Sequence, residues 1–133
     1  MSGSSPAIID ASALVELLLA SPRAPAVIQA VSEAEVIAPD HVNVEVLNAL
    51  RRMERTGQIS PARAAEAVSD LIGMHLRRLP TASLLARAWQ MRAHVEIRDA
   101  CYVAAAQALD APLVTSDLRL SRAHGLGVPV IAV

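Results

Sequence analysis

Short apolar runs alternate with longer segments that carry helix signals, and this alternation restricts the fold more than any other feature of the sequence. A parallel sheet needs such connections, because a helix usually carries the chain back to the start of the next parallel strand. The sequence therefore predicts an α/β fold of three layers, in which a small, mainly parallel sheet has helices on both faces. We expect strands at residues 7–10, 36–38, 111–115 and 128–133, with a short edge strand at 78–80.

Capping residues mark where several helices begin and end. Asp40 is a good N-cap for the helix that follows it, and Gly57 ends that helix. Ser60 followed by Pro61 starts the next helix, since serine caps well and proline fits the first helical turn. We expect helices at residues 12–20, 26–33, 41–56, 61–75, 81–93, 99–109 and 117–124.

The 133 residues are enough for one domain with a core of its own. We expect a flexible leader at residues 1–5, followed by a single domain at residues 6–133. Glu16 interrupts the best apolar run, so no segment approaches the ~20 residues that span a membrane, and we expect no signal peptide. Cys101 is the single cysteine, which excludes an internal disulfide and favours a reducing, cytoplasmic location.

Four acidic residues stand beside or within apolar segments, where carboxylates are unfavourable. Asp10 and Asp117 follow predicted strands, Asp99 opens the sequence DACYVAAA, and Glu45 lies within the stretch VNVEVL. Ligand sites in such sheets lie beyond the carboxyl ends of the strands, so distant parts of the chain can meet there. A carboxylate near an apolar core is costly unless it is paired or binds a metal. The set therefore predicts a site for a hard divalent cation, since Mg²⁺, Mn²⁺ and Ca²⁺ all prefer oxygen ligands.

Each of the four acids also has a simple structural explanation. The three aspartates can cap the helices that follow them. Glu45 lies too far inside its predicted helix to cap it, and that helix is apolar nearly all round. It shares one helix face with three other polar side chains, His41, Asn48 and Arg52. That face is either exposed, with Glu45 in a weak surface pair, or it lines a cleft in which Asn48 supports the carboxylate.

All 12 basic residues are arginines, whereas aromatic residues make up only 2% of the chain. Arginine binds phosphate through two nitrogens at once, while nucleic-acid binding by stacking needs several aromatic rings. If the chain contacts RNA or DNA, we therefore expect arginine, phosphate and metal to carry the contact. The net charge of −1 by itself favours no partner. Five arginines near the acids in sequence are candidates for phosphate contacts, although each also fits an exposed helix face: Arg51, Arg52, Arg98, Arg119 and Arg122.

Four segments resemble, in their order and spacing, the motifs of the PIN-domain family and, within it, the VapC-type toxins of bacterial toxin–antitoxin pairs. They are IIDASAL at residues 8–14, EVLNALRR at 45–52, RDACYVAAA at 98–106 and LVTSDLRL at 113–120. Each motif is short, but together they extend over nearly the whole chain. One departure is Arg98, because the family often has an aromatic or other apolar residue before its third acid.

The resemblance implies a metal-dependent endoribonuclease that uses Mg²⁺ or Mn²⁺ and leaves 5′-phosphate and 3′-hydroxyl ends. The site positions of the family match four carboxylates and two supporting hydroxyls of this chain: Asp10, Glu45, Asp99 and Asp117, with Ser12 and Thr115. We expect Asp10, with Asp99 or Asp117, to contact the metal directly, and Glu45 to reach the metal or its water. The resemblance also implies an RNA substrate, a cognate antitoxin protein and a homodimer.

Two other kinds of function stay open. A receiver domain or a haloacid-dehalogenase-like phosphatase has a similar plan, but each normally places a lysine beside its acidic pocket, and this chain has no lysine. Asp10 also lacks a second acid two positions later. A catalytically inactive domain that only binds a partner is the other alternative, and the complete acidic set argues against it. The helices predicted at 12–20 and 41–56 supply either a groove for a partner helix or part of the core.

Overall fold

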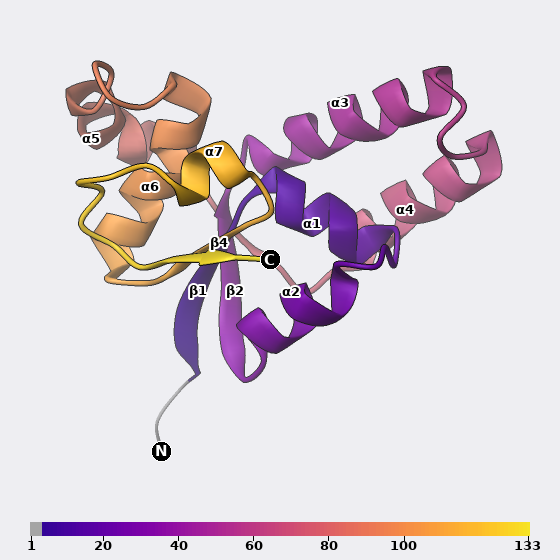
Figure 1. Ribbon diagram of the computed structural model, residues 1–133, viewed down its shortest axis with the longest axis horizontal. Helices are drawn as coiled ribbons and strands as arrows, with labels where there is room; N and C mark the ends of the chain where they lie inside the picture. The colour runs from indigo at the N-terminus through magenta and orange to yellow at the C-terminus, as the bar shows by residue number, and fades with distance from the viewer. Residues whose placement is uncertain (1–3) are drawn as a thin grey trace.

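Five short parallel strands form one sheet at the centre of the computed structural model, which describes residues 4–133 (Figure 1). Their order across the sheet is β3-β2-β1-β4-β5, and every neighbouring pair is parallel. The predicted α/β fold is therefore confirmed. The strands are β1 (Ser5–Ile9), β2 (Ala34–Pro39), β3 (Arg77–Leu79), β4 (Leu113–Thr115) and β5 (Val130–Ala132).

The central strand β1 joins the two halves of the chain. Ile8 is the register partner of Ile37 in β2 on one side and of Leu113 in β4 on the other. All three side chains are almost completely buried. Helices cover both faces of this sheet, so its middle strands consist of apolar residues without the alternation of a half-exposed sheet. The ends of β1 and β4 consequently lie side by side, although Asp10 and Thr115 are far apart in sequence.

Helices form a layer on each side of the sheet. In Figure 1, α1 and α2 lie on one side of the strands and α5 and α6 on the other, while α3 and α4 form a hairpin that extends away from the sheet. The helices are α1 (Ala11–Leu18), α2 (Ala24–Val31), α3 (Val42–Arg55), α4 (Pro61–Gly73), α5 (Leu85–Gln90), α6 (Ile97–Leu109) and α7 (Leu118–Ser121).

Helix α6 is the most buried helix of the described chain. Eight consecutive residues, from Asp99 to Ala106, are buried, because the helix packs against β1 and β2 and is covered by α5. A helix that is enclosed on most of its circumference needs small or apolar side chains all round, which the three alanines Ala104, Ala105 and Ala106 provide. The carboxylate of this buried run, Asp99, lies at its first position, at the edge of the core.

Several element boundaries differ from the sequence-based expectations. Ser60 caps α4 as predicted, with its hydroxyl accepting the Arg63 N–H at 3.1 Å. Asp40 does not cap α3, because its carboxylate instead accepts the backbone N–H of Thr81 at 3.2 Å. The helix predicted at 81–93 is a 3₁₀ turn, Thr81–Leu84, followed by the shorter α5.

The predicted leader at residues 1–5 falls partly outside the described residues, which begin at residue 4. Within the described part, β1 already starts at Ser5 and pairs with Ala34 of β2. Across residues 4–133, none of the helices combines the length and the apolar character that crossing a membrane requires.

Candidate active site

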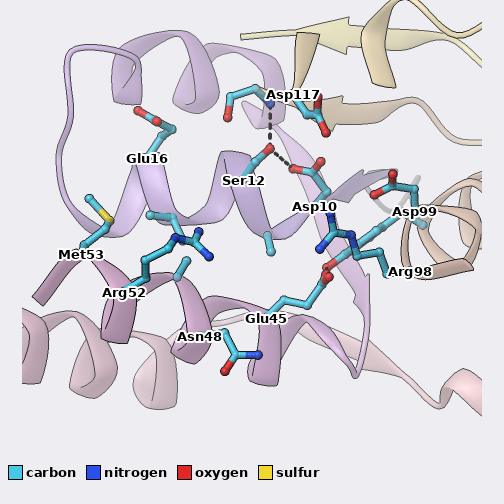
Figure 2. A pocket seen from close by; sticks show the side chains of 15 residues that line it. Asp10, Ser12, Glu16, Glu45, Asn48, Arg52, Met53, Arg98, Asp99 and Asp117 are labelled. Atoms are coloured by element: carbon cyan, nitrogen blue, oxygen red, sulfur yellow. Dashed lines mark hydrogen bonds between the residues drawn. The ribbon is translucent and has the colours of Figure 1, made fainter. Parts of the chain in front are cut away.

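One cleft brings together the four acidic residues that the sequence singled out. The cleft has a volume of about 480 Å³ and lies beyond the carboxyl ends of β1 and β4. Figure 2 shows its labelled side chains reaching inward from α1, α3, α6 and the loop after β4. The acids that line it are Asp10, Glu45, Asp99 and Asp117. Their meeting follows from the parallel sheet, since every strand of such a sheet delivers its carboxyl end to the same edge.

Asp10 is the innermost acid and is held by hydrogen bonds on both carboxylate oxygens. Ser12 Oγ donates to Oδ1 at 2.7 Å, the backbone N–H of Ala13 donates to Oδ1 at 3.0 Å, and Thr115 Oγ1 donates to Oδ2 at 2.5 Å. The residue also caps α1, as the simple structural explanation predicted. Asp10 can therefore cap α1 and line the cleft at the same time, because the capping bond from the Ala13 N–H involves only Oδ1.

Burial makes the carboxyl group of Asp10 a weaker acid. The residue is 5% exposed, and loss of hydration raises the pKa of its carboxyl group above the ordinary value of 3.8. The bonds from Thr115, Ala13 and Ser12 oppose this rise, because they stabilise the ionised form. The negative charge of Asp99 acts in the same direction as burial. A cation near Asp10 would favour the ionised carboxylate that burial disfavours.

The two supporting hydroxyls also fasten the end of β4 to the start of α1. Ser12 Oγ accepts the backbone N–H of Ser116 at 3.1 Å and lies 3.3 Å from Thr115 Oγ1. Thr115 Oγ1 accepts the backbone N–H of Asp117 at 3.0 Å. Each hydroxyl thus fixes both a carboxylate and a stretch of backbone. These contacts fix the position of Asp10 relative to the backbone of Asp117.

Asp99 and Asp117 share a single arginine. Arg119 Nη2 lies 2.8 Å from Asp99 Oδ2 and 3.0 Å from Asp117 Oδ2. The hydrogen bond to Asp99 and its negative charge, followed by those of Asp117, raise the pKa of Arg119. Asp117 also caps α7, accepting the backbone N–H groups of Arg119 and Leu120. The capping explanation for Asp99 is wrong, because α6 begins two residues earlier, at Ile97, and Asp99 lies in its first turn.

Glu45 is held by an aromatic side chain that sequence reasoning missed. The Tyr102 hydroxyl donates to Glu45 Oε1 at 2.5 Å, and burial, followed by the neighbouring Glu45, raises the pKa of this tyrosine. His41 Nε2 lies 3.6 Å from the same carboxylate oxygen, and its ring lies 4.7 Å from the Tyr102 ring between centroids. A signal was present in the sequence, since Tyr102 follows Asp99 by three residues on one helix face.

Glu45 does not cap its helix, as predicted, but the prediction that this helix is apolar nearly all round is wrong. Helix α3 begins at Val42, which puts Glu45 in the first turn, where a negative charge is favourable. Only one face of the helix is buried, while Val44 is 61% exposed and Leu47 is 44% exposed. The polar face with Glu45 therefore borders the cleft, and its apolar neighbours point partly to solvent.

Asn48 and the five arginines predicted as phosphate contacts lie in different places relative to the cleft. Asn48, Arg52 and Arg98 line the cleft, and Figure 2 shows both guanidinium groups extended over it. Arg51 and Arg122 are exposed and do not line it. Arg119, predicted as a phosphate contact, instead pairs with the acids of the cleft. Sequence reasoning missed one further lining acid, Glu16 of α1, which accepts a hydrogen bond from Ser21.

The donor chemistry of the cleft fits a hard divalent cation. Its candidate ligands are the oxygens of carboxylates and hydroxyls, which Mg²⁺ and Mn²⁺ prefer. Within residues 4–133, however, no three His, Cys, Asp or Glu side chains are grouped closely enough to hold an ion as they stand. As they stand, Glu45 is hydrogen-bonded to Tyr102, and Asp99 and Asp117 are both hydrogen-bonded to Arg119.

Comparison with known families identifies the class of this protein. Residues 7–126 match the family model described as PIN domain, so the chain belongs to the PIN-domain family, as its motifs indicated. Its curated relatives include ribonucleases VapC12 and VapC3 of Mycobacterium tuberculosis. VapC12 is 37% identical over 118 residues, which cover 89% of this chain and 92% of the relative. VapC3 is 38% identical over 125 residues, which cover 90% and 91%.

Two solved structures share the fold at low sequence identity. The structure of VapBC2 from Rickettsia felis bound to a promoter DNA fragment matches with a TM-score of 0.65 and 12% identity, covering 94% of this chain and 96% of that chain. PAE2754 from Pyrobaculum aerophilum matches with a TM-score of 0.65 and 21% identity, covering 98% and 88%. These likenesses support the PIN-like arrangement of sheet and helices.

Proposed function

We propose that this chain is a metal-dependent endoribonuclease of the VapC type, which cleaves phosphodiester bonds of RNA. The observation that carries the proposal is the convergence of Asp10, Glu45, Asp99 and Asp117, from four separate parts of the chain, on one cleft. Relatives named as VapC ribonucleases, at 37% and 38% identity over about nine tenths of the chain, support the same activity.

In this proposal the acidic residues hold Mg²⁺ or Mn²⁺, with Asp10, Asp99 and Asp117 as the direct ligands and Glu45 as a ligand of the ion or its water. When bound, such an ion supplies an activated water and stabilises negative charge on the phosphate that is cut. The hydroxyls of Ser12 and Thr115 orient the Asp10 carboxylate toward the cleft, since each donates to one of its oxygens.

Three more side chains have assigned tasks. Tyr102 orients Glu45 through the hydrogen bond to Oε1, and its buried ring leaves little freedom for that hydroxyl. Arg52 and Arg98 extend over the cleft, where their positive charge attracts the phosphate groups of RNA. No histidine is needed as a general base when a metal ion activates the water.

The decisive experiment is cleavage of a structured RNA by the purified chain with Mn²⁺ or Mg²⁺, compared with the variant Asp10→Asn. We expect a loss of activity of at least about a hundredfold, because a carboxylate that orients the ion is replaced by a neutral amide. Asp110→Asn is the matched control, since Asp110 is exposed, ends α6 and has a left-handed backbone that asparagine tolerates. Undiminished cleavage by Asp10→Asn or Asp99→Asn would rule out the proposed chemistry.

We further propose that the chain acts in the cytoplasm as the toxin of a toxin–antitoxin pair, in which a cognate antitoxin protein covers the cleft and two copies of the chain form a homodimer. Apolar side chains available to a protein partner support this. Val44 and Leu47 on α3 and Ile72 on α4 are exposed, the last to 77%, on the hairpin that extends from the sheet. Exposed apolar patches commonly mark protein interfaces.

A further inference from the structure

Arg119 stands among three acidic residues that come from different places in the chain. Besides the contacts of Nη2 with Asp99 and Asp117, its Nη1 atom lies 3.7 Å from Oε1 of Glu96, the residue before α6. Among residues 4–133, no other arginine forms an ion pair with any of the four cleft acids. Arg119 is therefore the arginine that forms ion pairs with the acids of the cleft.

An ordinary surface salt bridge is the simplest alternative, and two observations argue against it. In favour of that alternative, exposed ion pairs contribute little to stability, and the Arg119 side chain is 53% exposed. Its partner Asp99, however, is only 11% exposed and lies at the end of a buried helix segment. A single nitrogen atom also serves two carboxylates, which would repel one another if the arginine were absent.

We propose that Arg119 is a resident counter-ion, which neutralises Asp99 and Asp117 until a divalent cation takes over the same two carboxylates. This inference rests on the proposed metal-dependent function. The guanidinium and the cation would compete for these oxygens, because two positive centres that share the same contacts repel each other. Binding of the ion therefore includes displacement of Arg119, and the arginine sets how tightly the chain holds its metal.

The surroundings of Arg119 provide a place for the displaced side chain. A second hollow, of about 320 Å³, adjoins the cleft at Asp99 and is also lined by Arg119 and Glu96. Glu96 is 59% exposed and already contacts the other guanidinium nitrogen. The arginine can thus release Asp99 and Asp117 and keep Glu96 as its partner, so that its displacement does not leave it without a counter-charge.

The test is isothermal titration of Mn²⁺ into the full chain and into Arg119→Gln. We expect Arg119→Gln to bind Mn²⁺ about threefold to tenfold more tightly, the range that corresponds to the loss of two partly exposed pairs. Arg122→Gln is the matched control, since it removes the same charge three residues later from an exposed side chain outside the cleft. Its affinity should stay within about twofold of the parent, because distant exposed charges are screened by salt.

Thermal unfolding provides a second readout, which a merely structural arginine would not give. Without metal, Arg119→Gln should unfold at a lower temperature than the parent chain, because the two carboxylates repel each other. Saturating Mn²⁺ should remove this difference, since a bound ligand stabilises the folded state by an amount that grows with the logarithm of its affinity, and the variant is expected to bind more tightly. If the variant does not fold, the test is made on the parent chain by NMR, which follows the ¹⁵N signal of the Arg119 guanidinium group. That signal should shift on titration with Mg²⁺, while the signal of Arg122 stays constant.

The outcomes separate the two hypotheses. Equal or weaker Mn²⁺ binding by Arg119→Gln, or an Arg119 signal that Mg²⁺ leaves unchanged, overturns the role of Arg119 and leaves the proposed nuclease intact. Failure of the parent chain and of both variants to bind Mn²⁺ overturns the metal-dependent function together with this inference. Tighter binding by Arg119→Gln, with an unchanged Arg122→Gln control, supports both.

Discussion

Replacement of Thr115 by valine removes one hydroxyl group and keeps the shape of the side chain. That hydroxyl is completely buried, donates to Oδ2 of Asp10 at 2.5 Å and accepts the backbone N–H of Asp117 at 3.0 Å. In Thr115→Val the Asp10 carboxylate has one donor fewer and the Asp117 N–H loses its acceptor. The substitution therefore tests whether the junction between β1 and β4 depends on this one group.

The contacts give an approximate size for the effect. A hydrogen bond to a charged acceptor contributes about 1.5 to 3 kcal/mol, and a buried donor without a partner costs about 1 to 3 kcal/mol. The Asp117 N–H is only partly buried, so we expect a loss of about 3 kcal/mol in the free energy of unfolding. For 133 residues the unfolding entropy is roughly 0.28 kcal/mol/K, which converts this loss to a Tm about 11 °C lower.

The assay is urea and thermal unfolding of the metal-free chain at about pH 8. Thr56→Val is the matched control, because the Thr56 hydroxyl lies on the exposed end of α3, and it should change stability by less than about 0.5 kcal/mol. In an Asp10→Asn background the cost of Thr115→Val should fall by roughly half, because a neutral acceptor gives a weaker bond. The same cost in both backgrounds, or a cost no larger than that of Thr56→Val, would show that the Thr115 hydroxyl does not stabilise the junction through ionised Asp10.

Two further predictions concern acid stability and assembly. Burial raises the pKa of Asp10 above the ordinary value of 3.8. At pH values between that ordinary value and the raised pKa, the folded chain therefore keeps a proton on Asp10 that the unfolded chain has released. Its free energy of unfolding without metal should therefore decline as pH rises from about 4 toward the raised pKa. Asp10→Asn should flatten this part of the pH profile in urea unfolding, and an equally steep profile would contradict the assignment. Sedimentation equilibrium should give twice the chain mass of 14.0 kDa, and a monomer at every concentration would exclude the homodimer.

Apolar runs and capping residues were sufficient to predict the sheet and most helices. The segment VIA in β2 and the segment LVT in β4 have the composition of strands buried on both faces, and Ser60-Pro61 marks the start of α4. The segment at 81–93 was less predictable, because its leucines and alanines suit an α-helix. Its first turn tightens to a 3₁₀ geometry instead, next to the point where Asp40 accepts the N–H of Thr81.

The acidic residues of the cleft and the hydroxyls of Ser12 and Thr115 were visible in the sequence, but the partners of Glu45 and Asp99 were not. Local spacing placed Asp10 and Asp117 after strands, and the parallel fold was enough to bring them together. The bonds of Glu45 to Tyr102 and of Asp99 to Arg119 join residues from different elements. Such pairs depend on how the helices pack, which periodicity and capping do not specify.

The bond between Thr115 and Asp10 has a consequence for the time at which the site exists during synthesis. Asp10 leaves the ribosome well before Thr115 and Asp117, which come 105 and 107 positions later. Until β4 and the loop after it have emerged, a nascent chain lacks the Thr115 hydroxyl, one of the two that orient Asp10, and it also lacks the fourth acid. For a protein that we propose cleaves RNA, this order of synthesis delays assembly of the cleft until all the strands that border it have been made.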